Sequence, residues 1–144
     1  MYRVTQDILQ VFQNDNLNVF SKDSETFSYV YLYYELDKGG TCQIRFISTD
    51  DDNDFAVRVF RLICVKPSQR DRIIILLNEL NNKYRYAKFC CDSECRINVE
   101  YDYPSVGNNP AESAKEILYR FVNIINEAYP YIMKCVWGTD ANLE

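Results

Sequence analysis

The sequence predicts a single α+β domain over residues 1–144, in which helices cover one face of an antiparallel sheet in the order α-β-β-β-β-α-β-β-α. Three observations support this fold class. Apolar residues recur every three or four positions in three segments, apolar and polar residues alternate between those segments, and tight polar turns join consecutive strands. A chain of 144 residues buries about two thirds of its unfolded surface without disulfides or metals.

The first half of the chain predicts one helix and four strands. Residues 4–14 carry an apolar helical stripe that ends in NDNLN, and residues 17–22 suit a short strand. Residues 26–36 are β-branched and aromatic with period-2 alternation, which is typical of a strand. The turn DKGG then leads to a return strand over residues 41–49. A second turn, DDDND, precedes a strand over residues 55–65.

The second half predicts a helix, a hairpin and a long helix. Pro67 opens a helix that continues through RDRIIILLNELNNKY, and residues 86–92 and 96–103 form the hairpin. The last helix begins at Asn109-Pro110-Ala111-Glu112, which has the pattern of an N-cap, a proline at the first position and a capping-box glutamate. Pro130 should kink or end that helix.

Three of the six cysteines lie within this hairpin, in KFCCDSECRI. A three-residue loop aligns the two apolar faces and predicts the opposite pairs Asp92–Arg96, Cys91–Ile97 and Lys88–Glu100. Cys91 should then lie in the core, Cys90 should point outward, and Cys95 should take a positive φ at the loop. These thiols diverge and the chain has no histidine, so we expect ordinary reduced thiols rather than a metal or redox site.

Asp50, Asp52 and Asp54 have the spacing of the first three calcium ligands in an EF-hand loop. That loop needs glycine at its sixth position and glutamate at its twelfth, where this chain has Phe55 and Arg61. We interpret the acidic segment as a solvated turn, and we expect no metal ion and no cofactor.

An aromatic ladder follows one side of the strand at residues 26–36. Even positions there carry the apolar residues of a core face. The odd positions place Phe27, Tyr29, Tyr31 and Tyr33 on the other face, beside Arg45 of the return strand. One interpretation is a sheet face covered by the chain's own loops or helices. The functional interpretation is a partner-binding surface of Tyr29, Tyr31, Tyr33 and Arg45.

The helix after Pro67 carries more apolar residues than one stripe requires. Ile73, Leu76, Leu77 and Leu80 should face the sheet. Ile74 and Ile75 lie further round the helix, on the side that also carries Asn78. This pattern predicts a homodimer interface at Ile74, Ile75 and Asn78, with cover by another part of the same chain as the alternative.

The charge of the chain limits its partners. The formal net charge is −5, and no cluster of lysine and arginine offers a nucleic-acid surface. No segment reaches the ~20 apolar residues of a membrane span, and the N-terminus lacks the pattern of a signal peptide. We therefore expect a cytoplasmic protein that binds neither nucleic acid nor membrane. Without histidine or a phosphate-binding glycine motif, no catalytic constellation is recognisable.

The segment LLNELNNKYRYAKFCCDSECRINVEYDYP resembles the YbjN-like family of bacterial sensory transduction regulators, and EAYPYIMKCVWG resembles the closing segment of that family. The similarity extends over roughly residues 4–138, with Cys95 where the family often has glycine. It implies a fold like that of type III secretion chaperones, which are small, acidic, usually dimeric proteins that bind polypeptides without catalysis.

These observations favour a non-enzymatic protein-binding or regulatory module with a chaperone-like fold. It would capture an extended or helical segment of a partner polypeptide on an apolar, aromatic surface. The alternative is a small-ligand-binding sensor domain, which a concave pocket under the tyrosine ladder would favour.

Overall fold

The computed structural model describes residues 1–104 and 109–138, so residues 105–108 and 139–144 of the predicted domain lie outside the described residues. The order of helices and strands is the predicted one, with a 3₁₀ turn at Pro67–Gln69 before the second helix. The elements are α1 (Arg3–Asn14), β1 (Phe20–Asp23), β2 (Ser28–Glu35), β3 (Thr41–Ser48), β4 (Phe55–Cys64), α2 (Arg70–Lys83), β5 (Lys88–Cys91), β6 (Arg96–Tyr103) and α3 (Pro110–Trp137).

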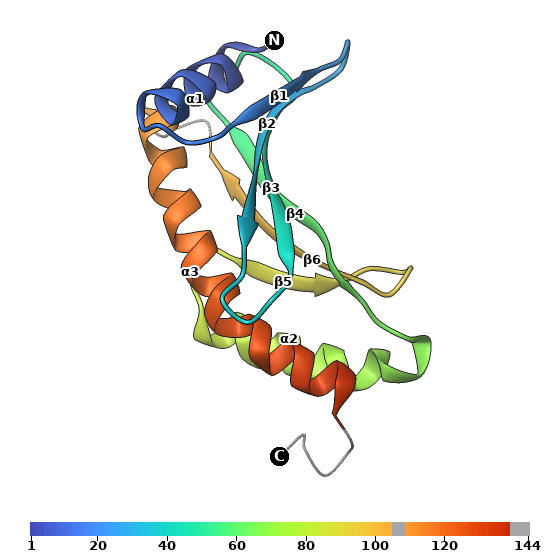
Figure 1. Cartoon of the computed structure of the whole chain (residues 1–144). Coiled ribbons are helices and arrows are strands. Elements are labelled where there is room, and N and C mark those ends of the chain that lie inside the picture. Colours follow the sequence, from blue (N-terminus) through green and yellow to red (C-terminus); the bar gives the residue numbers. More distant parts are fainter. Residues whose placement is uncertain (105–108, 139–144) are drawn as a thin grey trace.

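The six strands form one antiparallel sheet in the spatial order β1-β2-β3-β4-β6-β5. Consecutive strands pair through short turns, except β4 and β5, which α2 connects and between which β6 lies, paired with both. Figure 1 shows the three helices gathered on one side of this twisted sheet. The predicted α+β fold class is confirmed. Within the described residues, no helix combines the length and the hydropathy that a membrane span needs.

The core lies between the helices and the sheet face turned toward them. Val30 and Leu32 of β2 are buried on this face, as the alternation predicts. The ring of Phe46 on β3 packs edge-on against Phe12 of α1, with 5.1 Å between the ring centroids. Helix α3 supplies the longest apolar stripe, which includes Ile117, Phe121, Ile125 and Ile132.

Helix α3 departs from two expectations. It continues through Pro130 to Trp137, so of the two predicted effects of this proline, a kink or an end, the end is wrong; Figure 1 shows the helix curving along its length. Ile132 and Cys135, beyond the proline, are buried. Burying such side chains offsets the roughly 3 kcal/mol that an internal proline costs. Asn109 precedes the helix as predicted, but its side chain makes no capping hydrogen bond within the described residues, and its φ is 51°.

The other boundaries differ by a few residues. Strand β1 begins at Phe20 rather than at residue 17, and β5 begins at Lys88 rather than at residue 86. Tyr86 has a φ of 72°, which extended strand backbone does not adopt, so the chain enters β5 only after this residue.

Candidate functional site

The sheet face turned away from the helices carries a continuous group of aromatic rings. Tyr31 of β2 lies opposite Phe20 of β1 and stacks on it, with 5.4 Å between ring centroids. Successive tyrosines of β2 are also in ring contact, with centroid separations of 5.6 Å for Tyr29–Tyr31 and 5.9 Å for Tyr31–Tyr33. We call this group, with one further ring from β4, the aromatic face: Phe20, Phe27, Tyr29, Tyr31, Tyr33 and Phe60.

The rings of the aromatic face differ in exposure. Tyr29 is only 8% exposed, although it does not belong to the core beneath the helices. Its cover comes from Phe27, just before β2, from Tyr31 on the strand, and from the guanidinium of Arg45, which lies 4.8 Å from the ring centroid. Phe20 is 41% exposed and Tyr33 is 57% exposed. Tyr29 therefore forms the floor of the surface, and the other two rings present apolar area to solvent.

Arg45 is the central cation of this face. Its guanidinium lies between two rings, 4.8 Å from the centroid of Tyr29 and 5.3 Å from that of Phe60. Its Nε donates to Gln43, whose amide in turn donates to the hydroxyl of Tyr33 at 3.1 Å. No carboxylate of the described residues forms an ion pair with Arg45, whereas Arg58 on the next strand pairs with Asp102 at 2.8 Å. The positive charge of Arg45 is thus available to a partner.

A bulge in β4 follows Phe60 directly. The register of β4 against β6 shifts between Val59 and Ile63, and Arg61 has a φ of 58°. Such a conformation costs roughly 1–3 kcal/mol for a residue with a side chain. The side chain of Asn98 holds the bulge by accepting the Arg61 N–H at 2.8 Å. Phe60, immediately before it, is 46% exposed beside Arg45.

The sequence-predicted partner residues therefore lie together, and two members of the surface were missed. Tyr29, Tyr31, Tyr33 and Arg45 share one face, as the alternation predicts. Phe20 lies within the strand predicted at residues 17–22, but it was missed because the pairing of that strand with β2, which sets its face, was not predicted. The alternation of Val57 and Val59 in β4 is the signal that could have placed Phe60 on the open face.

A hollow of about 520 Å³ adjoins one end of this face. Ile47 and Ala56 of the open sheet surface line it, together with the carboxylates of Asp54 and Asp102. Its volume falls within the range of small-ligand sites, which is ≈ 300–1,000 Å³. Of its two acidic residues, Asp102 already pairs with Arg58 at 2.8 Å.

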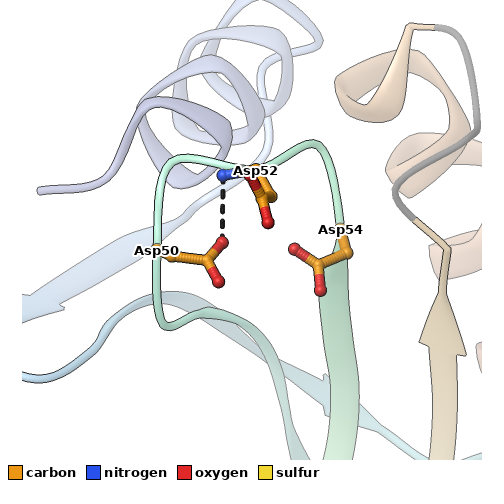
Figure 2. A group of neighbouring side chains, drawn as sticks. All are labelled: Asp50, Asp52 and Asp54. Atoms are coloured by element: carbon orange, nitrogen blue, oxygen red, sulfur yellow. Dashed lines mark hydrogen bonds between the residues drawn. The ribbon is translucent and has the colours of Figure 1, made fainter.

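The acidic turn before β4 brings three carboxylates close together. Figure 2 shows Asp50, Asp52 and Asp54 around the turn, and their nearest oxygens all lie within 4.8 Å of one another. The Asp52 N–H donates to the Asp50 carboxylate at 2.9 Å. Slight desolvation at the turn and the negative charges of Asp50 and Asp52 raise the pKa of Asp54. All three are exposed, and Ca²⁺ takes 6–8 oxygen ligands, so we retain the interpretation of a solvated turn.

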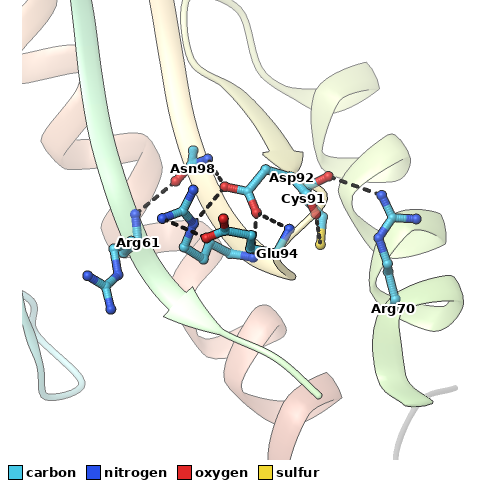
Figure 3. A network of polar contacts seen from close by, with 7 residues as sticks. Arg61, Arg70, Cys91, Asp92, Glu94 and Asn98 are labelled. Atoms are coloured by element: carbon cyan, nitrogen blue, oxygen red, sulfur yellow. Dashed lines mark hydrogen bonds and ion pairs between the residues drawn. The ribbon is translucent and has the colours of Figure 1, made fainter. Parts of the chain in front are cut away.

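The cysteine hairpin is organised by Asp92 rather than by its thiols. The register has Cys91 opposite Ile97 and Lys88 opposite Glu100, as predicted. The carboxylate of Asp92 accepts the backbone N–H groups of Glu94 and Arg96, and its second oxygen accepts from the side chains of Arg96 and Asn98. Figure 3 shows that Asn98 links this network to the N–H of Arg61 in the bulge.

The thiols of the hairpin differ from the prediction in burial. Cys91 was expected in the core but is only half-buried. Cys90 is also half-buried, and its outward direction stays a prediction. Cys95 takes the predicted positive φ, 60°, yet it is buried because its carbonyl accepts the N–H of Val65 and the loop packs against the end of β4. All six cysteines are free, and no metal-ligand cluster of the described residues contains a cysteine.

The outer side of α2 is a second apolar surface. Ile73, Leu77 and Leu80 are buried toward the core, as the helical spacing predicts. Ile74 is 39% exposed and Ile75 is 64% exposed. Asn78 is exposed on the same helix, beside a hollow of about 310 Å³ between α2 and β5. Ile75 is thus mostly uncovered by the described chain, and Ile74, which lines this hollow, is covered in part.

Comparisons with known proteins agree with this architecture. The crystal structure of the ExsC–ExsE complex contains a chain with a TM-score of 0.58 and 10% identity; the match covers 96% of this chain and 100% of that one. The crystal structure of YbjN from E. coli, described as "a putative transcription regulator", has a TM-score of 0.56 and 16% identity, covering 88% of this chain and 92% of that one. A search of curated proteins found no match.

The fold is that of the class represented by ExsC, a type III secretion chaperone, with an open sheet and helices on one face. The YbjN family, described as "Putative bacterial sensory transduction regulator", matches residues 36–134. The chain belongs to the YbjN family, and the predicted resemblance is confirmed.

The Asp92 network predicts a pH-dependent contribution to stability. Hydrogen bonds to the backbone and side chain of Arg96 and to Asn98 lower the pKa of Asp92 from 3.8 to about 2. A carboxyl whose pKa falls on folding stabilises the folded state above its unfolded pKa, and this contribution is lost as the pH falls through the folded pKa. The free energy of unfolding lost in Asp92→Asn should therefore be larger at pH 6 than near pH 2. Urea titrations of both proteins test this, and an equal loss at the two pH values would contradict it.

Proposed function

We propose that this protein is a non-enzymatic protein-binding or regulatory module that captures a partner polypeptide on the aromatic face. One observation carries the proposal: all three helices lie on one side of the sheet, and the opposite side exposes clustered rings around an arginine without a carboxylate partner among the described residues. ExsC, which shares the fold, was crystallised in a complex with ExsE. The family description as a regulator is consistent with such a role.

The chemistry of the aromatic face suits a protein partner. Tyrosine, other aromatic residues and arginine are over-represented among the residues that dominate interface energies. Tyr33 and Phe20 offer apolar area at a low cost in side-chain entropy, because their rings already contact Tyr31 or each other. Arg45 adds a charge that would pair with a carboxylate of the partner. We propose a cytoplasmic site of action and no catalytic chemistry.

A small-ligand sensor is the second candidate. The hollow of about 520 Å³ beside Ile47 and Ala56 favours it. The two functions differ in where they place the ligand, because the hollow lies at one end of the sheet face and the exposed rings of Phe20 and Tyr33 lie on β1 and β2.

We predict that Phe20→Ser/Phe60→Ser loses the partner while it keeps the fold. These two rings are 41% and 46% exposed, so their loss removes contact area and leaves the core intact. Tagged wild-type and variant proteins would be used to capture partners from the native host, and the captured proteins would be quantified by mass spectrometry. Circular dichroism and urea unfolding would verify that the variant is folded.

The matched control is Tyr131→Ser/Trp137→Ser on α3. It removes two rings that are even more exposed, 54% and 74%, and it should retain the partner. Loss of capture by both variants, or retention by both, would reject the aromatic face as the binding surface.

We further propose a homodimer formed through the outer side of α2. Ile74 and Ile75 are exposed in the described part of the chain, and a two-fold pairing of α2 would bury both copies at once. Asn78, one turn after Ile74, would lie within the same contact. The hollow between α2 and β5 would receive side chains of the second copy.

The dimer predicts a change in solution mass on introducing charge into α2. Ile74→Glu/Ile75→Glu should convert the dimer into a monomer, because four buried carboxylates at a two-fold contact are strongly unfavourable. Light scattering on the purified proteins at micromolar concentration measures this. The control Phe20→Glu/Phe60→Glu, on the opposite side of the molecule, should stay dimeric. A monomeric wild type, or a dimer unaffected by the α2 substitutions, would contradict the proposal.

A further inference from the structure

The two edges of the sheet differ in how far the rest of the chain covers their backbone N–H and C=O groups. At the β5 edge, the side-chain amide of Asn81 on α2 bonds to both backbone groups of Phe89: its oxygen accepts the N–H at 2.7 Å and its nitrogen donates to the C=O at 2.9 Å. Two residues further along β5, Arg70 donates to the backbone carbonyl of Cys91 at 3.4 Å. Side chains of α2 therefore occupy backbone groups that a further strand would need, and β5 cannot readily accept one.

The opposite edge is covered only in part. Strand β1 pairs with residues 28–31 of β2 and ends where Phe20 meets Tyr31. The carbonyl of Phe27 points toward the β1 side, where it accepts the N–H of Ser24. The N–H of Leu36 points toward the β3 side, where it donates to the carbonyl of Gly40. Backbone groups alternate sides along a strand. The odd residues of β2 therefore direct their N–H and C=O groups toward the β1 side, and the even residues direct theirs toward β3.

Tyr33 and Glu35 consequently have backbone groups without a neighbouring strand. No residue of β1 lies opposite either one, and no backbone hydrogen bond from another described loop reaches them. Both residues are exposed. Proteins usually protect such an edge with a side chain or a covering segment, as α2 protects β5 here. The half of β2 that follows Tyr31 lacks this protection within the described residues.

An apolar hollow lies beside this open edge, on the side of the sheet that faces the helices. Leu17, Leu32, Leu118 and Val122 contribute to its lining, and its volume is about 200 Å³. That is below the ≈ 300–1,000 Å³ of small-molecule sites, so it suits one or two apolar side chains rather than a free ligand. A strand added along β2 would direct every second side chain to this face of the sheet.

We propose that the open half of the β2 edge receives an extended segment of the partner polypeptide as an added strand, in line with β1. The segment bonds to the backbone of Tyr33 and Glu35, places an apolar side chain in the hollow, and brings the alternate side chains over the aromatic face beside Tyr33. A lysine or arginine of the segment lies opposite Glu35 and forms a cross-strand ion pair with its exposed carboxylate. The inference rests on the proposed function, and it adds that the bound polypeptide is extended.

The test uses a synthetic peptide, acetyl-Lys-Val-Thr-Leu-Thr-Val-Lys-amide, and amide hydrogen exchange of the wild-type protein followed by NMR. In the free protein, the amides of Tyr33 and Glu35 should exchange rapidly, while those of Tyr34, which faces β3, and Phe89, which Asn81 caps, should already be protected. Peptide at millimolar concentration should slow exchange at Tyr33 and Glu35 at least tenfold and leave Tyr34 and Phe89 unchanged.

The control peptide has the same side chains but carries N-methyl groups on its five central residues, so it cannot pair as a strand. It should give no protection. The proposal is overturned by equal effects of both peptides, by the absence of protection up to millimolar concentration, or by protection of Tyr33 and Glu35 in the free protein together with a dimer mass, which would assign the edge to a second copy.

The outcome is separable from that of the proposed function. Phe60 lies on β4, two strands away from the open edge, so peptide protection should persist in Phe60→Ser. If the peptide fails while Phe20→Ser/Phe60→Ser still loses the native partner, partner capture on the aromatic face stands and strand addition is rejected. If the peptide protects Tyr33 and Glu35 but Phe20→Ser/Phe60→Ser still captures the partner, the aromatic face is rejected as the capture surface and strand addition at the β2 edge stands.

Discussion

The alternation of side chains across β2, β3 and β4 is the constraint on which the rest of the structure depends. Each residue of these strands belongs to one of two faces, and a shift of one residue would exchange them. The helices all lie on one side, where Val30, Ile44 and Val57 are fully buried. The odd residues of β2 are therefore fixed on a face that no helix of the described chain covers, and that face is free for a partner.

The uncovered face is held in place by its own side chains. Tyr29 is buried beneath its neighbours and the guanidinium of Arg45, and Phe60 closes the other side of that guanidinium. The neighbouring bulge retains Arg61 at a φ of 58°, and Asn98 ties it to the Asp92 network of the hairpin. A surface already ordered in this way loses little conformational freedom when a partner binds, which favours affinity.

Local patterns predicted the elements whose cause is local. Parity alone placed Cys91 opposite Ile97 in the hairpin, and alternation placed the tyrosines of β2 on one face. Two of the failures have distant causes. The helix passes Pro130 because residues beyond it are buried against the core, and Cys95 is buried because its loop bonds to Val65. The open edge of β2 could not be predicted from the sequence either, because the length of β1 depends on its pairing with β2 rather than on composition.

A comparison of two phenylalanine truncations tests the two-faced sheet most directly. Phe46 is fully buried against Phe12 and Phe55, whereas Phe60 is 46% exposed on the opposite face. Urea unfolding should show that Phe46→Ala costs about 3–5 kcal/mol and that Phe60→Ala costs about 1 kcal/mol or less, the loss of one exposed cation–π contact. Similar costs for the two substitutions would mean that both faces are packed, which contradicts an open binding surface.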